Sequence, residues 1–140
     1  MDNVRDLISL HEGRVPHAYQ DSLGYWTIGI GRLIDKRRGG GLTEEESAYL
    51  LRNDINRTEA ALQKELPWVT TLDDARHGAL VNMSYNLGVA GLLKFRKFLA
   101  AMEAGDFKTA AAEAMDSTWA KQVGSRATRL RDQILTGEWR

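Results

Sequence analysis

The stretch "LHEGRVPHAYQDSLGYWTIGIGR" (Leu10–Arg32) decides the fold, because a helix end, a turn and short strands follow one another within it. Gly13 ends a first short helix, since glycine commonly follows the last helical residue. After Pro16 the pattern changes, and the runs HAYQ, YWTIGIG and RLI have the composition and length of short strands. The residues Asp21–Gly24 form the turn between the first two strands. We therefore expect all β structure to lie within about residues 15–35.

Helices are predicted from residue 43 to the end of the chain. Thr43 and Glu46 have the spacing of a capping box, and the helix that they open runs until Pro67. At 1.5 Å per residue this helix is about 30 Å long, long enough to connect two lobes. Apolar periodicity and following glycines predict further helices, with a short turn near Trp119, at 72–87, 92–104, 107–115 and 126–136.

The order of these elements predicts an α+β fold in one domain. A small β-hairpin lobe covers about 14–42, and a bridging helix covers 43–66. The larger helical lobe combines 1–12 with 67–140. Runs of strands followed by runs of helices are typical of this fold class. A ligand is expected in a cleft between the two lobes.

Composition excludes several classes of protein. The 140 residues carry 19 Lys and Arg against 19 Asp and Glu, so the net charge gives no support to nucleic-acid binding. The absence of cysteine excludes disulfides, a thiol nucleophile and thiolate metal sites. The three histidines lack metal-ligand spacing, so no metal site is expected, and the four tryptophans are expected in the core. No apolar run has the length of a membrane span, and the N-terminal sequence is too charged for a signal peptide.

Two carboxylates stand in contrasting settings. Glu12 precedes Gly13 at the end of the first helix, where the helix dipole and the margin of the apolar stripe both favour a raised pKa. Asp21 lies in a polar turn, where a carboxylate stays ionised. Such a pair suits a general acid and a water-activating group. Each residue also has an ordinary structural explanation: a solvated glutamate at a helix end, and an aspartate favoured by turn chemistry.

Thr27 is the third candidate. In the strand Tyr25–Gly31, Thr27 alternates with Tyr25, Gly29 and Gly31 on one face, while Trp26, Ile28 and Ile30 occupy the other. A hydroxyl beside two positions without side chains suits a flat surface where a ligand approaches the backbone. β-branched residues are also common in strands for packing reasons alone.

These motifs resemble the phage-type lysozymes, the endolysin muramidases of glycoside hydrolase family 24. The family pattern has a Glu closing the first helix, an Asp in the following turn, and a Thr opening T-I-G-x-G, and all of it stands in this chain. The resemblance continues through LTEEESAYLLRNDI, ARHGALVNMSYNLG and TWAKQVGSRATRLRDQILTGEW. One departure is Arg32, which stands where the family usually has His.

The resemblance implies a lysozyme-like fold and hydrolysis, with inversion, of the β-1,4 bond between N-acetylmuramic acid and N-acetylglucosamine in peptidoglycan. It implies that Glu12 is the general acid and that Asp21, with Thr27, activates water. Positions at the saccharide cleft of the family correspond to Leu33, Tyr85 and Asn86. It further implies a monomer without cofactor, made in a host cytoplasm, that reaches the bacterial cell wall with the help of a holin-type partner.

Two other functions stay open at the level of sequence. A lytic transglycosylase would use one Glu as acid and base, exclude water and produce anhydro-sugars. A non-catalytic peptidoglycan-binding protein would use the same fold without cleaving the wall, although neither candidate carboxylate is missing here.

Overall fold

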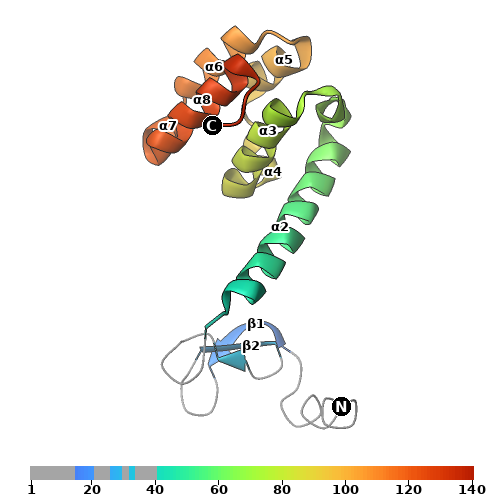
Figure 1. Ribbon diagram of the computed structural model, residues 1–140, viewed down its shortest axis with the longest axis vertical. Coiled ribbons are helices and arrows are strands. Elements are labelled where there is room, and N and C mark those ends of the chain that lie inside the picture. Colours follow the sequence, from blue (N-terminus) through green and yellow to red (C-terminus); the bar gives the residue numbers. More distant parts are fainter. Residues whose placement is uncertain (1–14, 21–25, 30–31, 34–40) are drawn as a thin grey trace. The chain divides into compact units, whose positions relative to one another are not determined.

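The computed structural model describes residues 15–20, 26–29, 32–33 and 41–140. The chain divides into two compact units, Met1–Leu50 and Leu51–Arg140. Figure 1 shows the strands in the first unit and a set of helices in the second.

The strands of the first unit are β1 (Val15–Gln20), β2 (Trp26–Gly29) and β3 (Arg32–Leu33). They pair antiparallel in the order β1-β2-β3. Ile28, which we expected on a face fit for the core, is 37% exposed. The predicted first helix and the turn Asp21–Gly24 lie outside the described residues. The separate β-hairpin lobe and the cleft facing it therefore stay predictions.

Helix α2 (Glu44–Glu65) begins and ends where the sequence predicts. The backbone N–H of Thr43 donates to Oε1 of Glu46 at 3.0 Å, and the N–H of Glu46 donates to Oγ1 of Thr43 at 3.1 Å. This reciprocal pair is a capping box, which satisfies two N–H groups that the first helical turn leaves free. Pro67 then opens the short 3-10 helix η2 (Pro67–Thr71).

The remaining helices form the body of the second unit (Figure 1). They are α3 (Asp74–Leu87), α4 (Val89–Leu92), α5 (Arg96–Ala104), α6 (Phe107–Met115), α7 (Thr118–Val123) and α8 (Ser125–Thr136). The predicted helix at 92–104 is wrong at its start, because α4 ends at Leu92 and Phe95 has a non-helical backbone (φ −84°, ψ 61°). On one continuous helix Leu92 and Phe98 would point about 120° apart. The break allows both side chains to be buried.

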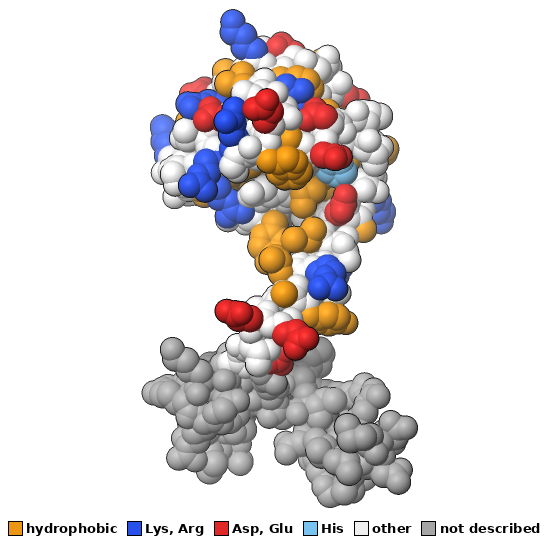
Figure 2. Space-filling model, in the orientation of Figure 1, with side chains coloured by type: hydrophobic (Ala, Val, Ile, Leu, Met, Phe, Trp, Pro, Cys, Tyr) orange, Lys and Arg blue, Asp and Glu red, His pale blue; other side chains and the backbone are white. Residues whose placement is uncertain are grey.

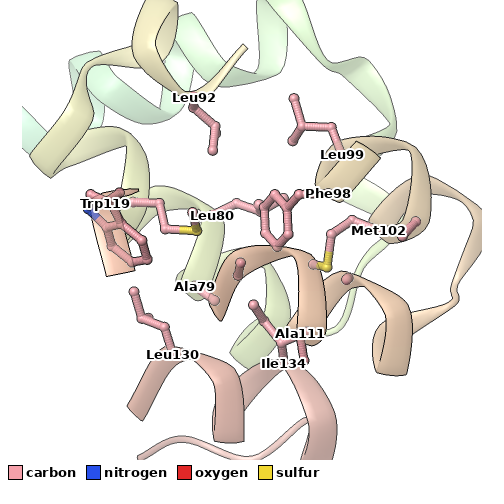
Figure 3. Packing of buried hydrophobic residues seen from close by; sticks show 14 of the residues in the cluster. Ala79, Leu80, Leu92, Phe98, Leu99, Met102, Ala111, Trp119, Leu130 and Ile134 are labelled. Atoms are coloured by element: carbon pink, nitrogen blue, oxygen red, sulfur yellow. The ribbon is translucent and has the colours of Figure 1, made fainter. Parts of the chain in front are cut away.

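One hydrophobic core joins these helices (Figure 3). Leu80 and Met83 of α3 are fully buried, and so is Met102 of α5. The fully buried side chains of helix α6 are all small, namely Ala110, Ala111 and Ala114, and the helix packs against both α5 and α8. Alanine at these positions brings the helix axes close together, so the helices after α2 form a closely packed body. Trp119 lies in this core as predicted, whereas Trp139 is 65% exposed, so the expectation that all four tryptophans build the core is wrong for Trp139.

Candidate functional site

The second unit carries an open groove beside Tyr85, which we call the Tyr85 groove. Its volume is about 510 Å³. Tyr85 lies in the last turn of α3, and it is 46% exposed. The groove is lined by Leu51, Ile55, Glu59, Asp74, His77, Gly78, Val81, Asn82, Tyr85, Arg126 and Trp139. An apolar floor with a few charged groups at the rim is typical of small-molecule sites.

Trp139 covers part of this groove because residue 78 has no side chain. A Cβ atom built on Gly78 would lie 2.3 Å from Cη2 of the Trp139 ring. The indole therefore packs directly against the backbone of α3 and leaves most of its surface exposed. Together with Tyr85 it supplies two exposed aromatic surfaces to the same groove.

Four of the polar side chains that line the groove form two pairs. Nε2 of His77 lies 3.2 Å from Oε1 of Glu59, but the geometry is not that of a hydrogen bond, and this buried nitrogen has no hydrogen-bond partner within the described residues. Arg126 is held more firmly. Its Nε and Nη2 donate to Oδ1 of Asn82 at 2.9 and 2.6 Å, and Nη2 also donates to the Asn82 carbonyl oxygen at 3.3 Å. Arg126 is thus an oriented cation at the rim of the groove.

Tyr85 also lines a second open groove, of about 620 Å³. The groups there come from α2, α3 and the start of α4, and they are Asp54, Arg57, Thr58, Ala61, Ser84, Gly88 and Val89. Asp54 and Arg57 form an ion pair at 2.9 Å. Tyr85 therefore lines two grooves of the second unit.

Asn86, the neighbour of Tyr85, has a structural contact. Its Oδ1 accepts a hydrogen bond from Nε1 of Trp119 at 2.8 Å, and Trp119 is buried in the core. The Nδ2 group of Asn86 makes no hydrogen bond within the described part of the chain and stays available to a ligand.

The other predicted site residues lie in the first unit. Glu12 and Asp21 fall outside the described residues, so their geometry stays a prediction. Thr27 of β2 and Leu33 of β3 are direct backbone partners in the sheet, and Tyr19 of β1 pairs with Thr27 from the opposite side. The six candidates are thus divided between the two units, with Tyr85 and Asn86 in the second.

Asn82 is a groove residue that the sequence analysis did not identify. Asn82 precedes Asn86 by one helical turn, so both polar side chains lie on the same face of α3. This spacing was the feature of the sequence that could have identified it. Its contact with Arg126 spans 44 positions of sequence and follows no local pattern. Among the described residues no cluster of three or more His, Cys, Asp or Glu could hold a metal ion. Within the same part of the chain, no helix is long and apolar enough to cross a bilayer.

Comparison with known proteins gives a consistent result. The family model described as "Phage lysozyme" matches residues 9–133, a span that includes all six candidate residues. Probable T4-type lysozyme 1 of Dictyostelium discoideum is 30% identical, over 98% of this chain and 96% of that protein. The endolysin of Acyrthosiphon pisum secondary endosymbiont phage 1 is 30% identical over 86% of this chain and 80% of its own length. The pre-baseplate central spike protein Gp5 of Enterobacteria phage T4 is 32% identical over 96% of this chain, which spans only 28% of that protein.

Proposed function

Because the chain belongs to the phage lysozyme family, we propose that it hydrolyses the β-1,4 bond between N-acetylmuramic acid and N-acetylglucosamine in bacterial peptidoglycan. Membership makes the protein a glycosidase of the lysozyme and endolysin class. The observation that carries the proposal is the family match over residues 9–133, which contains both an acidic residue at a predicted helix end and one in the following turn. Most glycoside hydrolases use two carboxylic side chains that flank the scissile bond, one of which protonates the leaving oxygen.

In the proposed mechanism Glu12 donates its proton to the leaving glycosidic oxygen. Asp21 accepts a proton from water on the opposite face of the sugar ring, and the Thr27 hydroxyl positions that water. Attack by water opposite to the leaving group inverts the anomeric configuration, and such enzymes leave roughly 6.5–9.5 Å between the two carboxyl groups. Proton transfer between carboxylates and water needs no cofactor.

Leu33, Tyr85 and Asn86 are proposed to contact the glycan. The exposure of Tyr85 beside two grooves supports this role, because an aromatic ring offers a flat apolar surface to a sugar ring. The free Nδ2 group of Asn86 is suited to donate to a sugar hydroxyl or acetamide oxygen.

The proposed architecture is that expected from sequence: a β-hairpin lobe at 14–42, a bridging helix at 43–66 and a helical lobe of 1–12 with 67–140, with the glycan bound in the cleft between them. The protein is proposed to act as a monomer on the bacterial cell wall, after synthesis in a host cytoplasm and release with a holin-type partner.

The test uses chemically defined peptidoglycan and four proteins: the unmodified chain, Glu12→Gln, Asp21→Asn and the control Glu45→Gln on the exposed start of α2. We expect Glu12→Gln and Asp21→Asn to lower the cleavage rate by about 100- to 10,000-fold with unchanged circular dichroism. NMR of the fresh product should show the α-anomer, which reports inversion.

Other outcomes would overturn the proposal. Near-normal activity of Glu12→Gln would exclude this residue as the acid. Anhydro-muropeptides in the mass spectrum, with Asp21→Asn still active, would identify a lytic transglycosylase. Tight wall binding without any cleavage by the unmodified chain would identify a binding protein.

A further inference from the structure

The side chain of Asn86 is oriented by a partner that can only donate. Its Oδ1 accepts a hydrogen bond from Nε1 of Trp119 at 2.8 Å. A carboxamide carries an acceptor on one branch and two donors on the other, whereas an indole N–H has no acceptor function. The opposite orientation of the amide would place its NH₂ group against the indole N–H, donor against donor. The chemistry of the pair therefore fixes which branch of Asn86 faces Trp119.

Trp119 is itself held in place. It is 4% exposed and lies in the hydrophobic core shown in Figure 3. Ser117 caps the start of its helix, α7: the Ser117 Oγ accepts from the backbone N–H of Ala120 at 3.1 Å and donates to the carbonyl oxygen of Ala114 at 2.7 Å. The indole N–H is thus a rigid donor, and an amide oriented by such a donor loses little side-chain entropy when a ligand binds.

The second branch of the amide is the one left for a ligand. Asn86 is exposed, although its oxygen is bonded to a buried ring. Because Oδ1 faces Trp119, the Nδ2 group is the branch that faces away from it. The side chain therefore offers N–H donors to a ligand, rather than the mixture of donor and acceptor that a freely turning amide would offer.

A side chain that offers only donors selects ligand groups that accept. Glycan hydroxyls both donate and accept, so they could bond to either orientation of the amide. The carbonyl oxygen of an acetamide only accepts, and both sugars of the proposed substrate carry an acetamide. Removal of the acetyl group leaves an ammonium, which only donates and would oppose the NH₂ group of Asn86.

We propose that Trp119 is a positioning residue, which turns the Asn86 amide so that it binds an acetamide carbonyl oxygen of the glycan. The protein would therefore favour N-acetylated over de-N-acetylated peptidoglycan at this position. The inference rests on the proposed function and adds to it a preference between two chemical forms of the wall.

The experiment measures kcat/KM on peptidoglycan before and after enzymatic removal of its acetyl groups, at about pH 6, where a primary amine is protonated. The readout is the ratio of the two values, since a smaller folded fraction lowers both equally. We expect the unmodified chain to prefer the N-acetylated wall about ten-fold, as for one hydrogen bond made or lost. Asn86→Asp keeps an oxygen for Trp119 and should reverse this preference, because its second oxygen accepts from an ammonium. Trp119→Phe should reduce the preference to about three-fold, because the released amide can present its oxygen as well.

Two control variants account for general effects of charge and stability. Figure 2 shows Lys, Arg, Asp and Glu side chains on the surface of the second unit, and a positively charged wall would interact with all of them. Asn56→Asp adds the same charge on the exposed side of α2 and should change the ratio less than about two-fold. Leu99→Val trims the same core from α5 and leaves the hydrogen bond between Asn86 and Trp119 in place, so it should keep the ratio.

Three results would overturn the inference. Asn86→Asp could keep the preference of the unmodified chain, or Asn56→Asp could reverse the preference to the same extent. Trp119→Phe could lower kcat/KM on both walls and keep their ratio, which would make Trp119 a purely structural residue.

A binding measurement separates failure of this inference from failure of the proposed function. A soluble glycan fragment is titrated into ¹⁵N-labelled Glu12→Gln protein, and the Nδ2 signals of Asn86 should shift more with the N-acetylated fragment than with the de-N-acetylated one. Cleavage of the wall by the unmodified chain without any such difference would overturn the inference and leave the proposed function intact. The expected shifts without any cleavage would instead overturn the proposed function.

Discussion

The side chain of Asn86 joins the surface of α3 to the core, since its Oδ1 accepts a hydrogen bond from Nε1 of the buried Trp119 at 2.8 Å. Replacing Asn86 by Leu would leave the indole N–H without its partner. A buried donor without an acceptor costs about 1–3 kcal/mol, and we expect a loss of that size in the free energy of unfolding, measured by urea denaturation. The control Asn56→Leu, on the exposed side of α2, should stay within about 0.5 kcal/mol of the unmodified chain. An equal loss in both variants would contradict the structural role.

The variant Asn86→Asp tests the proposed glycan contact of Asn86 while it keeps the hydrogen bond to Trp119. The variant keeps an oxygen that accepts from Trp119 but loses the Nδ2 donor. If Nδ2 contacts the glycan as proposed, KM for wall fragments should rise several-fold while Tm changes by only a few degrees. Unchanged KM and kcat would remove Asn86 from the list of substrate-binding residues.

Arg76 is expected to be the most important cation for stability in the second unit. Its Nε donates to the carbonyl oxygen of Ile134 at 2.7 Å, its Nη2 donates to that of Leu135 at 3.1 Å, and its guanidinium carbon lies 3.7 Å from the centre of the Phe107 ring. Arg76→Met would leave the last turn of α8 without these donors. We expect a loss of about 2–4 kcal/mol, measured by urea denaturation.

Two further variants test this reading of Arg76. Arg76→Lys should recover only part of the stability, because an ammonium cannot reproduce the fork. Arg57→Met is the control, since the side chain of Arg57 is 80% exposed and its ion pair should contribute less than about 1 kcal/mol. A stability loss for Arg57→Met as large as that for Arg76→Met would contradict the assignment.

The helical part of the fold was predictable where its signals are local. The capping box at Thr43 and Glu46 is present, and Gly88, Gly105 and Gly137 each follow a helix with a positive φ. The break between α4 and α5 was not predictable, because the apolar period continues through residues 92–99 and only burial of both Leu92 and Phe98 favours a break.

The candidate site could be predicted only in part, for a similar reason. Tyr85 has a recognisable position before Gly88 and lies exposed beside a groove, while its role in binding stays a prediction. The pairs Asn82–Arg126 and Asn86–Trp119 join residues 44 and 33 positions apart. No periodicity or spacing predicts such contacts, since they depend on how α3, α7 and α8 pack. Glu12 and Asp21 rest on sequence alone.

Gly78→Ala tests the position of Trp139. The new Cβ atom would meet the far edge of the indole at 2.3 Å, so the exposed ring must move. We expect a shifted Trp139 indole signal in the NMR spectrum and a change of less than about 1 kcal/mol in stability, because alanine favours the helix by about that amount over glycine. In a Trp139→Ala background the same substitution should stabilise the protein by about 1 kcal/mol. Destabilisation there would show that another group fills the space above Gly78.

Because of Asp106, the stability of the second unit is expected to depend on pH in the acid range. The Thr109 side chain, the Thr109 backbone N–H at 3.2 Å and the nearby Lys108 lower the pKa of this carboxyl at the start of α6. A lowered folded-state pKa means that the stabilisation is present above the unfolded-state pKa of about 3.9 and is lost as the pH falls through the folded-state value. Asp106→Asn should therefore flatten the stability curve below about pH 4, as measured by urea denaturation.

Thr109→Val is the companion variant for Asp106. It removes the hydroxyl but keeps the backbone N–H, so it should remove only part of the acid-side slope. If neither variant changes the slope of the unfolding free energy against pH, then other carboxyl groups cause the pH dependence.

Ser84→Ala is expected to stabilise the protein. Ser84 is 2% exposed, and its Oγ has no hydrogen-bond partner within the described residues, so the hydroxyl pays a desolvation cost without compensation. Alanine removes that cost and also favours the helix. In the control Ser47→Ala, on the exposed side of α2, stability changes only through the higher helix propensity of alanine. Urea denaturation should show Ser84→Ala gaining about 1 kcal/mol more than Ser47→Ala. A loss of stability in Ser84→Ala would mean that the hydroxyl donates to a carbonyl of α3 in solution.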